Sequence, residues 1–529
     1  EAKAAKPVTL KQRSDLRDIP LITIDPPDAR DHDDAVWAEA DPDPKNPGGV
    51  IVIVAIADVA HYVRPGSLLD REARKRGNSC YFPDRVVPML PEDLSTDLCS
   101  LRPNVDRACL AVRMVFAANG KKRSHEFIRG LMKSAAKLSY AQVEAARLGT
   151  FDDETKPLWK PVLKPLWEAF EVVNRGREAR EPLHLDLPEP RIRLRSDGTV
   201  KEIVTEPYLL SQRLIEELMI QANVAAAETL ERRKVPTLFR VHDEPAKEKL
   251  EALQETLKTT SLSLAKGQVI KPAVFNRLIE RAAGTAYEPL IGEMVLRSQS
   301  QAAYAPDNIG HFGLNLGRYA HFTSPIRRYA DLIVHRGLIA AHTFGADGLN
   351  DEDASRLGQI AEDISGTERR ALAAERDSTD RYMAAYMEPL IGQEFRVRIV
   401  GVTRFGLFVR VERTGADGLV PMRALPDEFF KHDAKGHRLV GERSGLVFRL
   451  GDTLDVRLEE AAPLSGGLRF SLLGEYKTKG SAKRRSKKRS AKAGAQKSDA
   501  DPSKKKSDRH GRATRSKKSA KAKRTKRER

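Results

Sequence analysis

Cysteine is scarce in this sequence, and long apolar runs are missing from it. The 529 residues include three cysteines, Cys80, Cys99 and Cys109, and no two of them form a C-x-x-C pair. This usage argues against a disulfide framework or a zinc site built on cysteine pairs, and it fits a reducing cytoplasm. No stretch of 18 apolar residues and no signal-peptide pattern is present, so the sequence predicts a protein without a membrane partner.

Excess positive charge is also missing from most of the chain, although the net charge is +18. Residues 477–529 hold 24 Lys and Arg against 4 Asp and Glu, whereas residues 1–476 hold 68 basic and 70 acidic residues. The tail has no aromatic residue, cannot bury a core, and is predicted to be disordered. Its charge suits nucleic acid or ribosomes, with a simple gain in solubility as the alternative. A near-neutral body that handles a polyanion must gather its basic side chains in a channel.

Four carboxylates lie between two predicted strands near the start of the chain. The segment LITIDPPDARDHDDAVW, residues 21–37, places them in a turn between two β-branched runs: Asp25, Asp31, Asp33 and Asp34. Carboxylates this close raise one another's pKa unless a cation lies between them. Oxygen ligands favour Mg²⁺, with Mn²⁺ as the alternative, over zinc. The bland alternative is a solvated acidic turn.

Three further stretches each contain a candidate functional residue that could instead serve only the fold. Residues 50–60 predict a strand buried on both faces, and Asp58 at its end is either another site carboxylate or a turn residue. Residues 209–234 predict a helix whose Glu216 the local pattern assigns to a solvated face. Tyr81 precedes a proline-rich turn, where packing is favoured over stacking.

The segment YAHFTSPIRRYADLIVHRGL, residues 319–338, predicts a helix with an anion site at its start. Ser324 suits the N-cap and Pro325 the first helical position, which puts Arg327 in the first turn beside free backbone N–H groups. A guanidinium there would bind phosphate. The alternative is an arginine that only reaches solvent. A long charged helix is predicted from Asp351 to Met387, with Glu375 in its middle.

From Gln393 onward, alternating strands separated by glycine turns predict a small β-barrel. Its aromatic rings are interleaved with basic side chains: Phe405, Phe408, Phe429 and Phe430 with Arg404, Arg410 and Lys431. Rings amid cations are typical of single-strand binding. Core packing accounts for some of these rings.

Five motifs in one order make residues 18–473 resemble the RNase II/RNase R (RNB) family of 3′→5′ exoribonucleases, closest to its RNase R branch. The motifs are TIDPPDARDHDDA, VAIADVAHYVRPG, YFPDRVVPMLPEDLSTDLCSL, HFGLNLGRYAHFTSPIRRYADL and the C-terminal barrel. The resemblance implies an α+β fold in four parts. These are a linker remnant at 1–20, an RNB catalytic domain at 21–390, an OB-fold domain of ribosomal-protein-S-one type at 391–475 and a disordered Lys/Arg-rich tail at 476–529.

The resemblance also implies the site residues. The four aspartates would be the magnesium-site carboxylates, with Asp33 the one whose loss most damages the chemistry. Tyr81 would stack on the 3′-terminal nucleotide, Arg327 would grip the scissile phosphate, and Glu375 would belong to the same active site. Tyr140 and Glu216 would sense the ribose 2′-OH, which separates RNA from DNA. Arg404, Phe405 and Phe408 are the barrel's candidate RNA contacts.

The implied activity is processive hydrolysis of single-stranded RNA to nucleoside 5′-monophosphates in RNA decay and quality control. Structured RNA would be unwound as it is pulled into a narrow channel. The expected protein is a cytoplasmic monomer that binds RNA, and its tail would contact ribosomes or quality-control factors. A non-catalytic RNA-binding protein is the rival class, and a DNA exonuclease is a second rival that Tyr140 and Glu216 disfavour.

Two features depart from the family pattern. The family places two cold-shock domains before the catalytic domain, and none is present here; the polar opening segment and Glu1 in place of Met suggest a fragment. Leu185 occupies the position expected for a second stacking aromatic residue, which puts a two-sided aromatic clamp on the bases in doubt.

Overall fold

The computed structural model describes residues 1–474 except 186–189, 259, 261, 265–268, 286 and 435. Residues 1–476 form one compact unit. The tail that the sequence predicts to be disordered lies outside the described residues. In the part that is described, no helix is both long and apolar enough to cross a membrane.

A seven-stranded mixed sheet forms the centre of the first part of the chain, with the strand order β1-β8-β7-β4-β3-β2-β9. Its strands are β1 (Ser14–Asp15), β2 (Ile22–Asp25), β3 (Asp34–Ala40), β4 (Val50–Ala57), β7 (Asp106–Phe116), β8 (Lys122–Lys133) and β9 (Ala136–Ser139). Neighbours from β2 to β8 are antiparallel, while β1 pairs with β8 and β9 with β2 in parallel. The predicted strand at residues 50–60 is confirmed as β4, which is buried along its whole length.

Each face of the sheet has its own hydrophobic core, because alternate residues of a strand point to opposite faces. In β4, Val52 and Val54 join one core, and Ile53 and Ala55 join the other. Helices cover both faces: α1 (Leu68–Arg76), α2 (Tyr140–Arg147), α3 (Thr155–Leu158), α4 (Lys164–Arg180), α5 (Leu210–Arg233), α9 (Tyr329–His342), α10 (Asp351–Ser355) and α11 (Leu357–Met387). The helix predicted at residues 209–234 is confirmed as α5.

A smaller helical unit, two hairpins and a further antiparallel strand pair complete this region. The helices α6 (Lys247–Leu257), α7 (Pro272–Ala282) and α8 (Glu288–Ser298) share a separate core. The hairpins pair β5 (Cys80–Tyr81) with β6 (Val86–Val87) and β10 (Pro190–Leu194) with β11 (Val200–Thr205). The further antiparallel pair joins β12 (Phe239–Val241) to β13 (Ala303–Ala305), which come before and after the three helices in the chain. Leu185 packs against the core of the helical unit.

The C-terminal strands close into a five-stranded barrel, as predicted from residue 393 onward. The order is β14-β15-β16-β21-β20, and the strands are β14 (Glu394–Thr403), β15 (Gly406–Val411), β16 (Asp417–Pro421), β20 (Thr453–Ala462) and β21 (Gly467–Leu472). A small sheet follows β16 in the chain, formed by β17 (Phe430–Asp433), β18 (Arg438–Gly441) and β19 (Val447–Arg449). The α+β class with a terminal OB-like barrel is therefore confirmed.

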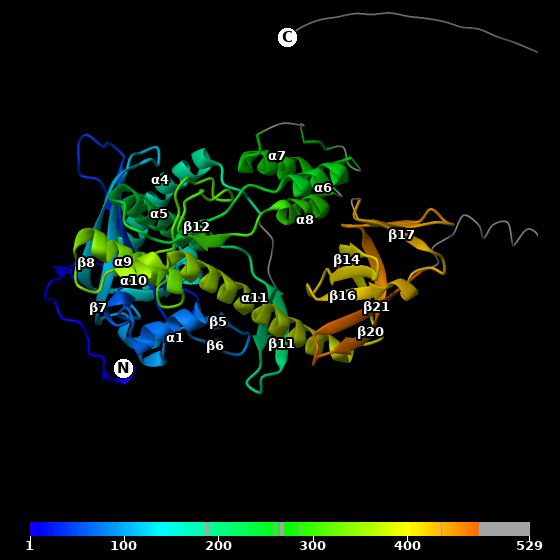
Figure 1. The fold of residues 1–529 in the computed structure, drawn as a ribbon, viewed down its shortest axis with the longest axis horizontal. Helices are drawn as coiled ribbons and strands as arrows, with labels where there is room; N and C mark the ends of the chain where they lie inside the picture. Colours follow the sequence, from blue (N-terminus) through cyan, green and yellow to red (C-terminus); the bar gives the residue numbers. More distant parts are fainter. Residues whose placement is uncertain are drawn as a thin grey trace, which may run out of the picture. The chain divides into compact units, whose positions relative to one another are not determined.

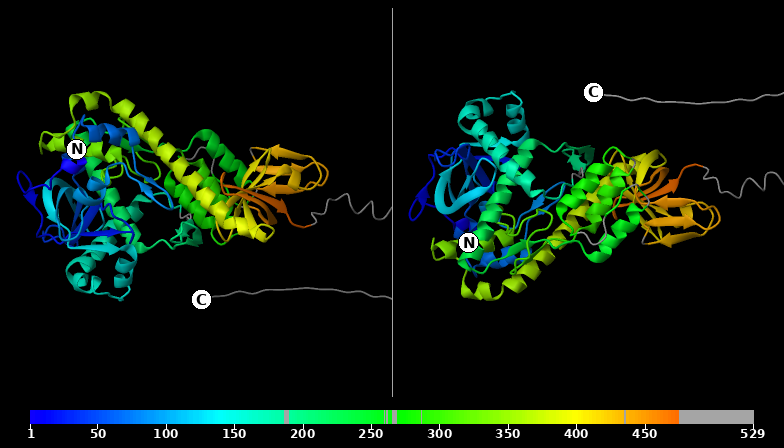
Figure 2. Two further views of the ribbon diagram at one scale, coloured as in Figure 1. Left: turned by 90° about the horizontal axis from the view of Figure 1, so that it is seen from below. Right: turned by 90° about the horizontal axis from the view of Figure 1, so that it is seen from above.

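Helix α11 joins the two regions (Figure 1, Figure 2). Ile360 and Ile364 near its start pack in a core of the sheet, whereas Met383 and Met387 near its end pack in the barrel core. The long helix predicted from Asp351 to Met387 is broken once, because α10 ends at Ser355 and α11 begins at Leu357.

Part of the N-terminal stretch that the sequence suggested to be a linker belongs to the sheet. Strand β1 pairs with Gly130 and Leu131 of β8. Just before it, the Arg13 guanidinium lies 2.6 Å from the buried carboxylate of Asp58. Local composition gave no sign of the Arg13–Asp58 ion pair, since the two residues are more than 40 positions apart in the chain.

Candidate active site

The acidic loop joins two adjacent strands, as the sequence predicts. Asp25 is the last residue of β2 and Asp34 the first of β3. The Ala29 N–H donates to the Pro26 carbonyl at 3.0 Å, which closes a turn. The Lys137 ammonium on β9 donates to the Ala29 carbonyl at 2.7 Å. The loop is thus held against the sheet edge rather than free in solvent.

Asp33 is the most constrained carboxylate of the loop. It is 4% exposed, and its Oδ1 accepts a hydrogen bond from the Ile326 backbone N–H at 2.9 Å. Its Oδ2 has no hydrogen-bond partner among the described residues and lies 3.7 Å from Arg327 Nε. Burial raises the pKa of Asp33 well above its ordinary value, and the positive charge of Arg327 opposes this shift.

Asp34 is also short of positive charge. Burial and repulsion from the nearby Asp25 carboxylate raise the pKa of Asp34 to about 8, against the pull of Arg327 and Arg328. A carboxyl group with this pKa would be largely protonated at neutral pH unless a further cation approached it. The site therefore favours a divalent cation beside Asp25 and Asp34.

His32 supports Asp25, and the sequence analysis missed it. Its Nδ1 lies 2.7 Å from Asp25 Oδ2, and the ring is buried. Its backbone N–H donates to Ser100 Oγ at 3.0 Å, and its carbonyl accepts from the Leu101 N–H at 2.9 Å. The available signal was a histidine inside an aspartate cluster, which could have been weighed as a carboxylate partner.

These residues line a cavity of about 520 Å³. The predicted site residues on its wall are Asp25, Asp31, Asp33, Asp34, Tyr81, Tyr140, Glu216 and Arg327. Ile215, Met219 and Ile220 of α5 give it an apolar side. Segments from opposite ends of the first 330 residues thus line one cavity. It contains the aspartate carboxylates, the Arg327 guanidinium and the rings of Tyr81 and Tyr140.

Tyr81 is anchored at two points. Its backbone N–H donates to Glu375 Oε1 at 2.6 Å, and its hydroxyl lies 3.4 Å from Asp31 Oδ2. The side chain is 40% exposed, so its ring is not a core side chain. Glu375 itself does not line the cavity; it fixes the strand that carries Tyr81.

The helix predicted to start at Pro325, with Ser324 as its N-cap, begins four residues later, so the placement of Arg327 in its first turn is wrong. Helix α9 starts at Tyr329, and Arg328 before it is extended. The reason is a tertiary pairing, in which Arg328 bridges to Asn78 and the Tyr329 N–H donates to the Gly77 carbonyl at 2.9 Å. The Ile326 N–H, which the sequence placed in the first turn of the predicted helix, donates to Asp33.

Arg327 still faces the carboxylates from the turn before α9. Its Nη2 donates to Ser324 Oγ at 3.1 Å, which steadies the guanidinium. Arg328 also lines the cavity and is held by two hydrogen bonds to Asp331. Arg328 was not singled out from the sequence, because an arginine pair in a predicted helix start gives no sign of which member faces inward.

Tyr140 and Glu216 reach the cavity from two helices. Tyr140 is the first residue of α2, which is capped by Ser139 and Gln142, and Glu216 lies on α5. The Tyr208 hydroxyl donates to Glu216 Oε2, and the Arg213 guanidinium lies 5.4 Å from the centre of the Tyr208 ring. Burial raises the pKa of Tyr140, with Asp34 and Asp25 adding to the shift.

The three candidate residues of the barrel lie apart from this cavity. Phe405 and Phe408 are 63% and 45% exposed, and the Arg404 guanidinium lies 4.8 Å from the centre of the Phe405 ring. Phe430 is instead buried in the barrel core. The rings therefore divide between surface and core, in line with the mixed expectation from the sequence.

The donor set fits a hard divalent cation. The carboxylates are Asp25, Asp31, Asp33 and Asp34, and one buried oxygen of Asp33 lacks a hydrogen-bond donor. Across the described residues, no three His, Cys, Asp or Glu side chains form a ready-made metal cage. Mg²⁺ commonly takes only one or two carboxylates and completes its shell with water and phosphate oxygens. The protein's share would then be Asp25 and Asp34.

Comparison with known proteins identifies the family. The RNB domain model matches residues 13–343, more than half of the chain. The chain belongs to the RNB family. An S1 RNA binding domain model matches residues 388–472, the barrel region of this RNB protein.

Relatives and solved structures agree with that assignment. Ribonuclease R of Escherichia coli (strain K12) is 40% identical over 472 residues, which cover 87% of this chain and 57% of the relative. The chain thus spans little more than half the length of this relative. RNase R of Mycoplasma genitalium in complex with ribose methylated single-stranded RNA superposes with a TM-score of 0.83 at 29% identity, covering 89% of this chain and 74% of the other.

Two further structures widen the comparison. The same Mycoplasma genitalium enzyme has been solved in complex with double-stranded RNA, with a TM-score of 0.77 at 27% identity, covering 89% of this chain and 79% of the other. Yeast Ssd1, described as a pseudonuclease, shares the fold with a TM-score of 0.64 at 20% identity, covering 82% of this chain and 53% of the other. The fold is therefore shared by a nuclease and by a protein described as a pseudonuclease.

Proposed function

We propose that this RNB protein is a divalent-metal-dependent 3′→5′ exoribonuclease that releases nucleoside 5′-monophosphates processively from RNA. The observation that carries the proposal is the buried Asp33, whose Oδ2 lacks a hydrogen-bond donor and lies 3.7 Å from Arg327 Nε in a cavity shared with three other aspartates. A burial of charge this costly indicates function more than stability. The relatives named RNase R support the substrate class.

Each residue of the site has a proposed part in this reaction. Asp25 and Asp34 would hold Mg²⁺, with Mn²⁺ as a substitute, while Asp31 and Asp33 orient its water ligands. The metal, when bound, lowers the pKa of the attacking water and offsets charge on the phosphate. Arg327 would neutralise the charge that builds on the phosphate, a contribution of about 3–4 kcal/mol by analogy with oxyanion holes.

The rings and Glu216 would position the 3′ end of the RNA. Tyr81, anchored through Glu375 and Asp31, would stack on the terminal base. Tyr140 and Glu216 would contact the ribose 2′-OH and so reject DNA. Leu185 packs in the helical core, so we propose that bases are stacked from one side only.

We propose that the sheet region up to residue 390 is the catalytic domain, starting near Arg13 because β1 and Arg13 are built into the sheet. The barrel at 391–475 would be the RNA-binding domain, with Arg404, Phe405 and Phe408 as its contacts. We further propose a cytoplasmic monomer that acts in RNA decay and quality control, also on structured RNA, with the basic tail at 476–529 contacting ribosomes or quality-control factors.

The test is product analysis of a 5′-labelled single-stranded RNA and the same-sequence DNA, each with Mg²⁺ and with EDTA. The proposal expects mononucleotides from RNA only, and only with the metal. Tight RNA binding without cleavage under any metal condition would instead support the non-catalytic class that Ssd1 exemplifies. Equal cleavage of DNA would contradict the roles of Tyr140 and Glu216.

A further inference from the structure

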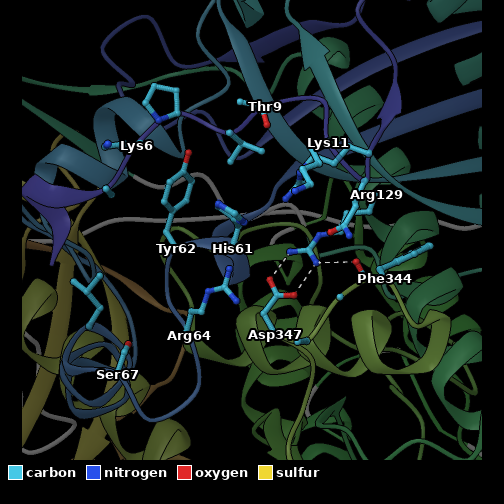
Figure 3. A pocket seen from close by; sticks show the side chains of 18 of the residues that line it. Lys6, Thr9, Lys11, His61, Tyr62, Arg64, Ser67, Arg129, Phe344 and Asp347 are labelled. Carbon is cyan, nitrogen blue, oxygen red and sulfur yellow. Dashed lines mark hydrogen bonds and ion pairs between the residues drawn. The ribbon is translucent and has the colours of Figure 1, made fainter.

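A second cavity, of about 950 Å³, lies where four separate stretches of the chain meet (Figure 3). Its walls come from the N-terminal segment up to Arg13, from the turn between β4 and α1 with the start of α1, from Arg129 of β8, and from the loop after α9. It shares no lining residue with the acidic cavity. Nothing in the proposed hydrolysis uses it.

The lining of this cavity is strongly basic. Its basic side chains are Lys6, Lys11, Arg13, His61, Arg64 and Arg129, against two acids, Glu1 and Asp347. Figure 3 shows Lys11, His61 and Arg64 pointing toward the same space. A concentration of one charge in a hollow raises the local concentration of ligands of the opposite charge.

The arginines of the floor are already neutralised. Arg13 Nη2 and Arg129 Nε lie 2.6 and 2.7 Å from Asp58 Oδ2, and Arg129 Nη2 lies 2.5 Å from Asp347 Oδ2. These side chains are almost fully buried, and the two arginines balance the two aspartates. This floor of the cavity is therefore electrically neutral, and the charge of Asp347 is already compensated by Arg129.

Three cations above this floor have no acidic partner. Lys6, Lys11 and Arg64 are exposed, and no ion pair or side-chain hydrogen bond links any of them to another described residue. The remaining acid, Glu1, accepts hydrogen bonds from the Leu68 and Leu69 N–H groups at the start of α1. The cavity therefore carries an uncompensated charge of about two positive units, three from these side chains less one from the Glu1 carboxylate.

The uncharged side chains of the lining indicate which kind of anion the cavity would bind. Tyr62 and Phe344 bring aromatic rings into the lining, and Thr9 and Ser67 bring hydroxyl groups. Burial lowers the pKa of His61, so its neutral ring adds a further flat surface. Phosphates bound by separate lysines and arginines, with bases against rings, are the pattern of single-stranded nucleic acid recognition. The volume is at the upper end of small-molecule sites and suits more than one nucleotide.

We infer that this basic cavity binds a single-stranded RNA segment through its phosphodiester backbone, at a site distinct from the cavity that holds the 3′ end. Lys6, Lys11 and Arg64 contact phosphates, and Tyr62 stacks on a base. The inference rests on the proposed function, because it takes RNA as the polyanion that the protein meets. It assigns to the N-terminal segment a part in gripping the strand upstream of the scissile bond.

The test compares two triple variants, both carrying Asp33→Asn so that RNA stays intact. The first is Lys6→Gln, Lys11→Gln and Arg64→Gln. The control is Lys45→Gln, Lys156→Gln and Lys160→Gln, which removes the same charge at exposed lysines that line neither cavity. The dissociation constant of a long unstructured RNA is measured over a salt series, and circular dichroism confirms that each variant is folded.

We expect the slope of log Kd against log salt to fall by roughly 2 in the first triple variant, since each single-strand phosphate contact contributes about 0.7. The control slope should stay within a few tenths of the parent. A thiouridine-substituted RNA should cross-link to the peptide that contains Tyr62. Equal slopes in both triple variants, or cross-links that avoid this peptide, would overturn the inference.

Two parallel measurements separate this inference from the proposed function. Wild-type protein is assayed for mononucleotide release, and an absence of release would contradict the proposed function whatever the two triple variants show. Inorganic phosphate is used as a competitor in the cross-linking assay. If it abolishes a Tyr62 cross-link while RNA affinity is the same in both triple variants, the cavity is a small-anion site and the RNA inference is wrong.

Discussion

Two buried aspartate clusters stand at the same end of neighbouring strands, and they are built in opposite ways. Asp34 opens β3 opposite Ile56 of β4, and Asp58 follows the end of β4. Arg13 and Arg129 hold the pKa of Asp58 well below its ordinary value despite its burial. Asp33 and Asp34 have raised pKa values because burial and repulsion from neighbouring carboxylates outweigh the pull of Arg327, of Arg328 on Asp34 and of the Ile326 N–H on Asp33.

The contrast shows how to tell a structural buried charge from a functional one. A carboxylate that serves the fold is given its counter-charges by the chain itself, as Asp58 is. A carboxylate that serves chemistry is left partly uncompensated, so that a metal or substrate supplies the missing charge.

Asp33→Asn should lower the rate of RNA hydrolysis by roughly 10³-fold or more while leaving RNA affinity nearly unchanged. The amide oxygen can still accept the Ile326 N–H, so the fold is kept. Single-turnover kinetics with Mg²⁺ measure the effect. Asp28→Asn is the control, because Asp28 lies in the same loop but is exposed and outside the cavity; mononucleotide release by Asp33→Asn at the wild-type rate would sink the metal assignment.

Asp58→Asn should act on the fold instead. It leaves Arg13 and part of Arg129 buried without a counter-charge, which is expected to lower the free energy of unfolding by about 3 kcal/mol. Urea denaturation measures this value, and hydrolysis per folded molecule should change little. A loss of stability no larger than that of Asp28→Asn would show that the Asp58 network is not structural.

The free energy of unfolding should depend on pH in opposite ways for Asp34 and Asp58, and this can be measured without an activity assay. The folded-state pKa of Asp34, about 8 against 3.8, means that the folded protein keeps a proton that the unfolded chain has lost. Metal-free stability therefore falls as pH rises between these values, by at most ~1.4 kcal/mol per pH unit for this group. Asp58, with a lowered pKa, contributes stability that is lost only in acid.

Thermal melts in EDTA between pH 6 and pH 8, just below the folded-state pKa of about 8, compare wild type with Asp34→Asn. The variant should show a shallower fall, and adding Mg²⁺ to the wild type should flatten its curve in the same way. Parallel curves for wild type and variant would mean that Asp34 is ionised without a metal.

The barrel rings should give the smallest effect. Phe405→Ala and Phe408→Ala are each expected to weaken RNA binding by about 1 kcal/mol, roughly fivefold, through lost stacking. Fluorescence anisotropy with single-stranded RNA measures the change. Leu464→Ala is the matched control, because Leu464 is an exposed apolar side chain of the same barrel without a ring; an equal loss there would show that the rings act only as apolar surface.

Much of the fold follows from sequence patterns that are local. Residues 50–57 are β-branched and apolar without alternation, which fits a strand buried on both faces. The acidic loop lies between two predicted strands, so its place at the ends of β2 and β3 was predictable. Helix α5 and the barrel strands likewise carry their own periodicity.

The errors arose where distant pairing decides the structure. Ser324 and Pro325 carry a local helix-start signal, but the pairing of Arg328 with Asn78 moves the start to Tyr329. The N-terminal segment has the composition of a linker, yet Asp58 draws Arg13 into the sheet. The supporting roles of His32 and Tyr208 also depend on partners that no local pattern identifies.

The most direct test of the account is Mn²⁺ binding, followed by electron paramagnetic resonance on wild type, Asp34→Asn and Asp28→Asn near neutral pH. If uncompensated carboxylates of the acidic cavity hold the metal, Asp34→Asn should lose most of the bound Mn²⁺ signal and Asp28→Asn should keep it. Equal binding by all three proteins would place the metal elsewhere and contradict the reading of Asp25 and Asp34 as its ligands.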